Sequence, residues 1–260
     1  MNCSFVTKSL NNVKNMHLHT LSAGKTMKAV ILAGGRGKRL RPLTDSVPKP
    51  LIEVRGKPII VWQIEWLKSY GINEFIVCVG YLKEKIINYL GDGSEYGVRI
   101  GYVVERKPLG TGGAIKNAEV FLRNESGFFV INGDIITTIN PEELTRLNSR
   151  HIGAIALVPL RSPYGIVEFD DDLTVRSFME KPLLRDYWIN AGVYYFKPDI
   201  FRYLPIEGDI ERTAFPNLAK FGLLKAVKYE NAFWRSIDTM KDLDEVSRLL
   251  GEKSVVSKRT

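Results

Sequence analysis

Cysteine and histidine are scarce in this chain of 260 residues, which contains two cysteines and three histidines. Two cysteines form neither a disulfide framework nor the ligand spacing of a structural zinc site, and they suit a reducing compartment, so we expect a cytoplasmic protein. Only one histidine, His151, lies beyond residue 26. This argues against a histidine nucleophile and against a histidine-rich zinc site.

Long hydrophobic runs are also lacking, because no apolar stretch approaches the roughly 18 residues of a transmembrane helix. We therefore expect no membrane partner. Acidic residues are outnumbered by basic ones, 29 to 37, which gives a formal net charge of +8. Such an excess suits a protein that handles several phosphates, and no nucleic-acid recognition motif accompanies it, so we expect no nucleic-acid partner.

The first 26 residues hold three lysines and no acidic residue. They lack the continuous apolar core of a secretory signal, and Met27 stands directly before the first predicted strand. We interpret residues 1–26 as a disordered extension or a misplaced start. Residues 27–250 are expected to form a single domain and residues 251–260 a tail.

The segment from Leu32 to Thr44 is rich in glycine and in positive charge. It follows the apolar run Lys28–Ile31, which predicts a buried strand. Glycines at a strand end bring bare backbone N–H groups up to a ligand, and cations beside them favour anions. The cations are Arg36, Lys38, Arg39 and Arg41, with Lys49 a short loop later in Pro48-Lys-Pro-Leu51. Together these features indicate a polyphosphate site.

Strands and helices alternate along the first half of the chain, which predicts a Rossmann-like, doubly wound, mostly parallel α/β sheet. The predicted strands cover Lys28–Ile31, Ile52–Val54, Phe75–Val79, Val98–Val104 and Phe128–Ile131, and the predicted helices cover 58–70, Leu82–Leu90 and the segment after Pro108. From His151 onward the strands lie closer together, and we expect antiparallel additions that bind a sugar. In such sheets ligands bind beyond the carboxyl ends of the strands, where the Gly-rich loop, Glu105 and Asp134 all fall.

The Gly-rich segment and Pro48-Lys-Pro-Leu51 resemble the signature of the sugar-1-phosphate nucleotidylyltransferases, also called nucleoside-diphosphate-sugar pyrophosphorylases. The resemblance covers residues 28–250. It implies an enzyme that transfers a nucleotidyl group from a nucleoside triphosphate to a sugar 1-phosphate, with pyrophosphate as the second product and Mg²⁺ as cofactor. Arg39 would contact the triphosphate and Lys49 would bridge the reacting phosphates. Lys38 stands where the family usually has Thr or Ser.

The same resemblance implies a nucleotide site and a metal site. The nucleotide site would comprise Leu32, Ala33, Gly34, Gly35, Glu105 and Gly110. Asp134 is the expected first Mg²⁺ ligand, since Mg²⁺ commonly takes one or two carboxylates plus phosphate oxygens. The family's second ligand lies in a Trp-x-Asp-x-Gly-Thr segment, but here Ser236 holds the Asp position. We expect Asp238 to take its place, the alternative being that Asp238 caps the following helix.

Three short motifs match the family's sugar-binding elements in order and spacing: Tyr164-Gly165, Glu180-Lys181-Pro182 and Asn190-Ala-Gly192. They imply that Lys181 binds the sugar phosphate, while Glu180, Asn190 and the Gly165 backbone bind sugar hydroxyls. Glu105 holds the position at which relatives that use uridine or thymidine nucleotides often have Gln. An ionised Glu only accepts hydrogen bonds, which suits guanine or the cytosine amino group. A carboxylate that never touches the base is the alternative.

The sequence therefore favours guanylyl transfer to a mannose- or heptose-type 1-phosphate, resembling the mannose- and heptose-1-phosphate guanylyltransferases. Transfer from CTP, dTTP or UTP to glucose 1-phosphate is the second hypothesis, because glucose-1-phosphate cytidylyltransferases have a segment similar to Ile237-Asp-Thr239. A third hypothesis is a catalytically inactive regulatory subunit, suggested by Lys38 and by the displaced aspartate. A homo-oligomer is compatible with all three.

Overall fold

The computed structural model describes residues 27–256. The strands are β1 (Lys28–Ala33), β2 (Glu53–Val54), β3 (Lys57–Pro58), β4 (Glu74–Val79), β5 (Arg99–Val104), β6 (Phe128–Asn132), β7 (Ile135–Thr137), β8 (Gly153–Arg161), β9 (Ile166–Phe169), β10 (Val175–Met179), β11 (Leu183–Phe196), β12 (Leu224–Lys228) and β13 (Trp234–Ser236). The α-helices are α2 (Leu43–Ser46), α3 (Ile59–Lys68), α4 (Lys83–Leu90), α5 (Gly110–Asn117), α6 (Glu119–Leu122), α7 (Ala214–Lys220) and α8 (Met240–Val256). Short 3₁₀ helices cover Lys38–Leu40, Lys49–Leu51, Ser94–Tyr96, Pro141–Thr145 and Pro198–Arg202.

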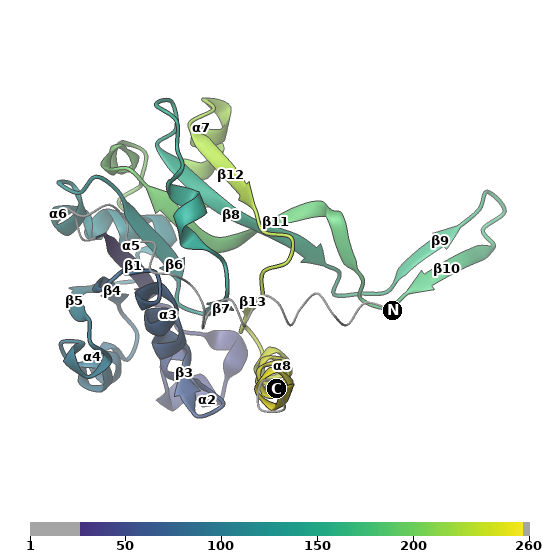
Figure 1. The fold of residues 1–260 in the computed structure, drawn as a ribbon, viewed down its shortest axis with the longest axis horizontal. Coiled ribbons are helices and arrows are strands. Elements are labelled where there is room, and N and C mark those ends of the chain that lie inside the picture. The colour runs from purple at the N-terminus through teal and green to yellow at the C-terminus, as the bar shows by residue number, and fades with distance from the viewer. Residues whose placement is uncertain (1–26, 257–260) are drawn as a thin grey trace.

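A seven-stranded sheet in the order β12-β8-β11-β6-β1-β4-β5 forms the centre of the molecule (Figure 1). Neighbouring strands run parallel except where β11 lies antiparallel to both β6 and β8. The predicted mostly parallel α/β sheet is therefore confirmed. The middle strands are almost continuous runs of buried apolar residues, as expected for strands covered by helices on both faces.

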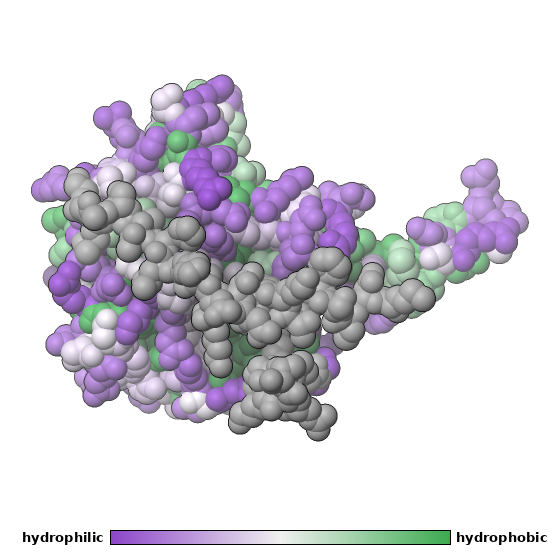
Figure 2. All heavy atoms as spheres, viewed as in Figure 1, coloured by the Kyte–Doolittle hydropathy of each residue, from purple (hydrophilic) through white to green (hydrophobic). Residues whose placement is uncertain are grey.

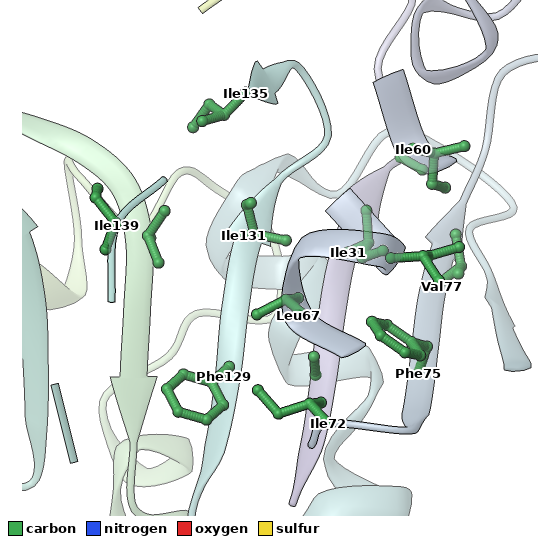
Figure 3. Close-up of a cluster of buried hydrophobic side chains, with 14 of the residues drawn as sticks. Ile31, Ile60, Leu67, Ile72, Phe75, Val77, Phe129, Ile131, Ile135 and Ile139 are labelled. Atoms are coloured by element: carbon green, nitrogen blue, oxygen red, sulfur yellow. The ribbon is translucent and has the colours of Figure 1, made fainter. Parts of the chain in front are cut away.

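Helices cover both faces of this sheet because successive side chains along each strand point to opposite sides. On one face, residues of α3 and α4 pack against Ile31, Phe75 and Ile131, and Figure 3 shows part of this cluster. On the other face, α5, α6 and α7 pack against Val30, Val130 and their neighbours. With both faces closed, the strand ends are the places left for ligands.

The second half of the chain supplies the expected antiparallel additions. β11 joins the main sheet antiparallel to its two neighbours, β8 and β12 extend that sheet, and β9 and β10 form an antiparallel hairpin of their own. The sequence failed to predict β7, which pairs antiparallel with β13. A 3₁₀ turn covers Pro198–Arg202, and α8 continues past residue 250, the expected end of the domain, to Val256.

The β9–β10 hairpin is an arm that projects from the body of the molecule (Figure 1). Large apolar side chains along it are exposed, including Phe169, Leu173 and Phe178. Figure 2 shows hydrophobic surface along the arm and hydrophilic residues at its tip. An isolated two-stranded hairpin is only marginally stable in water, so the arm draws little stability from its own two strands.

Within residues 27–256, no helix is both long enough and apolar enough to cross a membrane. The interpretation of residues 1–26 falls outside the described part of the chain and stays a prediction.

Candidate functional site

The carboxyl ends of β1, β5 and β6 bring three loops together at one edge of the sheet. β1 leads into the Gly-rich loop, β5 into Glu105, and β6 into Gly133 and Asp134. The loops are joined by backbone hydrogen bonds, because Gly133 donates its N–H to the Leu32 carbonyl at 3.0 Å. Parallel strands place their carboxyl ends on one side, which explains why residues far apart in sequence meet here.

The loop after β1 lines a cavity of about 270 Å³. We call it the loop pocket, and its walls are Leu32, Ala33, Gly35, Gly37, Lys38, Arg39, Lys49, Pro50, Gly133, Asp134 and Asp238. Both expected catalytic residues and both expected metal ligands are in this set. Gly37 has a φ of +59°, and a β-carbon there would lie 3.2 Å from the Lys49 β-carbon, so the turn brings the loop tightly over Lys49.

Lys49 lies between two carboxylates at the floor of the loop pocket. Its Nζ donates to Asp134 Oδ2 and to Asp238 Oδ1, each at 2.7 Å. Arg39 Nη2 also reaches Asp238 Oδ1 at 2.7 Å, from a side chain that is mostly exposed. The predicted residues Arg39, Lys49, Asp134 and Asp238 therefore form one charged cluster, although they come from segments as far apart as residues 39 and 238.

Asp238 precedes α8 but does not cap it with its side chain. The backbone N–H groups of Asp238 and Thr239 donate to Asp242 Oδ2, at 3.1 and 2.8 Å, while Thr239 Oγ1 accepts from the Asp242 N–H at 3.3 Å. This reciprocal arrangement is a capping box, and it leaves the Asp238 carboxylate free of the helix. The capping interpretation of the Asp238 side chain is thus wrong.

Ser236, which holds the family's aspartate position, donates its hydroxyl to Asp238 Oδ2 at 3.0 Å. Burial would raise the pKa of Asp238, but hydrogen bonds from Lys49 and Ser236 and the charges of Lys49 and Arg39 outweigh it and lower that pKa. Asp238 is therefore ionised at neutral pH. The serine and the displaced aspartate act as a pair, with the carboxylate turned toward Lys49.

The cluster offers two carboxylates, those of Asp134 and Asp238, as ligands for a divalent cation. The described residues contain no group of three or more His, Cys, Asp or Glu side chains suited to a metal. Asp134 and Asp238, each with about a quarter of its side chain exposed, nonetheless share one ammonium group and face one pocket. Two carboxylate oxygens completed by phosphate oxygens and water are a normal donor set for Mg²⁺. The residues present fit that ion.

Glu105 lines a second cavity, of about 320 Å³, which we call the Glu105 pocket. It shares Leu32, Gly35, Gly133 and Asp134 with the loop pocket and also includes Gly34, Pro108, Gly110, Thr111, Ala114, Asn132 and Asp209. Glu105 Oε2 accepts the Leu109 N–H at 3.1 Å. The other oxygen, Oε1, lies 2.4 Å from the place of a β-carbon on Gly34. A β-carbon at position 34 would therefore require the Glu105 carboxylate to move.

The expected sugar-binding residues fall into two places. Lys181 lines a third cavity, of about 450 Å³, together with Arg161, Trp234, Arg235, Ser236 and Lys241. Gly165 and Glu180 flank the two strands of the arm, and Lys181 forms a 3.3 Å ion pair with Glu180. Asn190 lies on β11 near the main site, where it accepts the Gly192 N–H at 2.8 Å and donates to the Tyr194 hydroxyl at 2.8 Å.

Residues 28–252 match the family described as nucleotidyl transferase. The chain belongs to that family. Its resemblance to the sugar-1-phosphate nucleotidylyltransferases, drawn from the sequence, is thereby confirmed.

Curated relatives in the family are named for guanylyl transfer. The chain is 36% identical over 225 residues to the Xenopus tropicalis protein named mannose-1-phosphate guanylyltransferase catalytic subunit beta. It is 38% identical over 226 residues to the Oryza sativa protein named probable mannose-1-phosphate guanylyltransferase 1. Both matches cover 83% of this chain and 62% of the relative, so the chain spans less than two thirds of their length.

A solved structure in the family is covered almost completely. HddC from Yersinia pseudotuberculosis shares 29% identity with this chain at a TM-score of 0.68, and the match covers 86% of this chain and 99% of HddC. A second structure of HddC, complexed with GMP-PN, matches at 28% identity with a TM-score of 0.67.

Sequence reasoning did not find every residue of the site. Thr111 could have been found, since it lies inside the Gly110-Thr-Gly-Gly113 segment that starts α5. Asp209 lies about a hundred residues further along and carries no motif, yet it accepts the Thr111 N–H at 3.4 Å. Only the folded chain brings these two together.

Proposed function

We propose that this protein transfers GMP from GTP to a mannose- or heptose-type 1-phosphate, releasing pyrophosphate and forming a GDP-sugar. The observation that carries the proposal is the Lys49 ammonium held between Asp134 and Asp238 in a glycine-lined pocket. The names of the curated relatives support guanylyl transfer and mannose 1-phosphate as the sugar substrate. The site requires no base from the protein, because the sugar phosphate supplies the nucleophile.

In this reaction a phosphate oxygen of the sugar 1-phosphate forms a bond to the α-phosphorus of GTP, and the bond from that phosphorus to the pyrophosphate oxygen breaks. Both substrates are anions, so the protein must hold them together and offset charge in the transition state. The Gly-rich loop offers backbone N–H groups, and Arg39 lies at the mouth of the pocket to contact the triphosphate. Lys49 is placed to bridge the attacked phosphate and the incoming one.

Asp134 and Asp238 would hold Mg²⁺, which would supply further positive charge at the reacting phosphates. Their role toward Lys49 is to fix the position of its ammonium group before the substrates arrive. Ser236 keeps Asp238 turned toward this point by its 3.0 Å hydrogen bond. The inactive-subunit hypothesis is disfavoured, since the aspartate displaced in sequence is directed into the cluster.

Glu105 supports a base with hydrogen-bond donors on its edge. One oxygen is engaged by Leu109, and the second lies against Gly34, which lines the Glu105 pocket together with Glu105. A carboxylate oxygen there accepts from the amino and imino groups of guanine, and it also accepts from the cytosine amino group. The proposed sugar-binding residues are Gly165, Glu180, Lys181 and Asn190. We also expect the protein to act in the cytoplasm.

The test is pyrophosphate release measured with GTP, CTP, UTP and dTTP, each combined with mannose 1-phosphate or glucose 1-phosphate in the presence of Mg²⁺. GTP with mannose 1-phosphate should give the highest kcat/KM. A higher value for CTP with glucose 1-phosphate would replace the proposal with cytidylyl transfer. Release from none of the pairs would favour the inactive subunit.

A further inference from the structure

A chain of hydrogen bonds runs from the nucleotide side of the site to Asn190 and involves two residues that no motif marks. At its first end, Thr111 lines the Glu105 pocket. Thr111 Oγ1 accepts the Ile210 N–H at 2.9 Å and donates to Glu211 Oε2 at 2.7 Å. The other carboxylate oxygen of Glu211 faces the Tyr194 hydroxyl at 3.5 Å. That hydroxyl in turn accepts from Asn190 Nδ2 at 2.8 Å.

The direction of each hydrogen bond follows from chemistry. An ionised carboxylate only accepts, so both Thr111 and Tyr194 donate to Glu211. The Tyr194 hydroxyl donates its only proton to Glu211, so it acts as the acceptor for the Asn190 amide nitrogen. Burial of the ring, with the nearby Glu211 charge next in importance, raises the pKa of Tyr194, so the hydroxyl keeps this proton. The Asn190 amide is thereby held with its nitrogen toward Tyr194 and its oxygen toward the Gly192 N–H.

Asn190, at the other end of the hydrogen-bond chain, lies close in sequence to residues that contact both the Glu105 pocket and the Lys181 cavity. A β-carbon on Gly192 would lie 2.7 Å from Asn132 Nδ2, and Asn132 lines the Glu105 pocket. Trp234, which lines the Lys181 cavity, donates its Nε1 to the Ala191 carbonyl at 2.7 Å. Held in this way, the Asn190 amide retains one N–H and one oxygen lone pair for a ligand, because each of its two polar atoms has capacity left.

We propose that Tyr194 and Glu211 are positioning residues that fix the Asn190 amide for the hydroxyl groups of the sugar 1-phosphate. The proposal rests on the proposed function, since it takes a sugar 1-phosphate as the ligand. Tyr194 is fully buried and lines none of the three cavities described above, so it acts only through its hydrogen bonds. Glu211 joins the sugar side to the loop that starts α5, because Thr111 is the second residue of that helix.

The test compares Tyr194→Phe with the parent in pyrophosphate release from GTP and mannose 1-phosphate. The KM for mannose 1-phosphate should rise about five- to tenfold, the loss expected for one hydrogen bond in water. The KM for GTP and the kcat should stay within twofold, because a contact made equally in the ground and transition states changes KM alone. Glu211→Ala should raise the KM for mannose 1-phosphate by a similar factor, and because it also removes the acceptor for Thr111 in the Glu105 pocket, the KM for GTP is compared in Tyr194→Phe alone. Glu211→Gln, which retains an acceptor oxygen, should recover most of the loss in the KM for mannose 1-phosphate.

Tyr195→Phe is the matched control. It removes the same hydroxyl from the next residue of β11, which points to the opposite face of the sheet and packs on Phe129. Its kinetics should equal those of the parent. If the parent shows no turnover, the proposed function fails and this proposal fails with it. If the parent turns over and both Tyr194→Phe and Glu211→Ala leave the KM for mannose 1-phosphate unchanged, or if Tyr194→Phe raises both KM values alike, the positioning role alone is overturned.

Discussion

Lys49 is the residue on which the site depends most, since it joins two carboxylates, those of Asp134 and Asp238, that lie far apart in the sequence. Lys49→Ala should lower kcat by about 10²- to 10³-fold, the usual loss when a preorganised charge is removed from a transition state. The measurement is pyrophosphate release with GTP and mannose 1-phosphate. Lys57→Ala, which removes a lysine paired with Glu65 outside the three cavities, should leave kcat unchanged. Near-parental activity in Lys49→Ala would show that the cluster is not the reaction centre.

Asp238 links this cluster to the pH dependence of folding. Its pKa is lowered in the folded protein, so it contributes stability above its unfolded pKa and loses that contribution as the pH falls through the folded value. Asp238→Asn should therefore lower the free energy of unfolding at pH 7, by roughly 1–2 kcal/mol for the charge-assisted hydrogen bonds lost. Urea unfolding at pH 7 and at acidic pH should show this gap closing in acid. A gap of the same size at both pH values would contradict the assignment.

The pKa of Glu105 is shifted in the opposite direction to that of Asp238. Burial raises its pKa, against the effect of the Leu109 hydrogen bond, so its ionisation costs stability as the pH rises through the folded pKa. Glu105→Gln should make the protein more stable than the parent at pH 7, with the advantage lost at acidic pH below the unfolded pKa. The same change adds a donor to the Glu105 pocket and should shift preference from GTP toward UTP or dTTP.

Both effects of Glu105→Gln can be measured on one preparation, by urea unfolding across pH and by kcat/KM for each triphosphate. Glu207→Gln is the control, because Glu207 is paired with Lys107 and lines neither the loop pocket nor the Glu105 pocket. An unchanged triphosphate preference in Glu105→Gln would remove Glu105 from base recognition.

At the scale of the element, the end of β1 shows why two adjacent glycines are not equivalent. A β-carbon at Gly34 would lie 2.4 Å from Glu105 Oε1, whereas a β-carbon at Gly35 meets nothing within 4 Å. Gly34→Ala should displace Glu105 and lower the melting temperature. Gly35→Ala should keep the parental melting temperature while raising the KM for GTP, because its methyl group enters the ligand space. Equal melting temperatures for the two variants would contradict this packing.

Much of the element structure was predictable because local patterns determine it. The buried strands Lys28–Ala33 and Glu74–Val79 are continuous apolar runs, and α3 follows directly after Pro58. β7 was not predictable, since Ile135–Thr137 is three residues long and is recognised only by its pairing with β13. The choice for Asp238 between capping and the cluster also needed the structure, because Asp is a good residue for either.

At the scale of the whole molecule, the sequence predicted a mostly parallel sheet with antiparallel additions but not the order of its strands. Alternating strands and helices specify parallel neighbours, but nothing local says that β11 inserts antiparallel between β6 and β8. That insertion brings Gly192, whose N–H donates to Asn190, against Asn132 of the Glu105 pocket. The motifs at Gly165 and Glu180 were visible in the sequence, whereas their position beside the strands of a projecting arm was not.

The central claim is that an oxygen of the sugar 1-phosphate attacks the α-phosphorus of GTP at this site. The most direct measurement uses mannose 1-phosphate with ¹⁸O in the non-bridging phosphate oxygens, together with GTP and Mg²⁺, followed by mass spectrometry of the products. The account predicts GDP-mannose that retains all of the label and equimolar unlabelled pyrophosphate, with both products formed about 10²- to 10³-fold more slowly by Lys49→Ala. Label in pyrophosphate or in free phosphate, or no GDP-mannose from the parent protein, would contradict it.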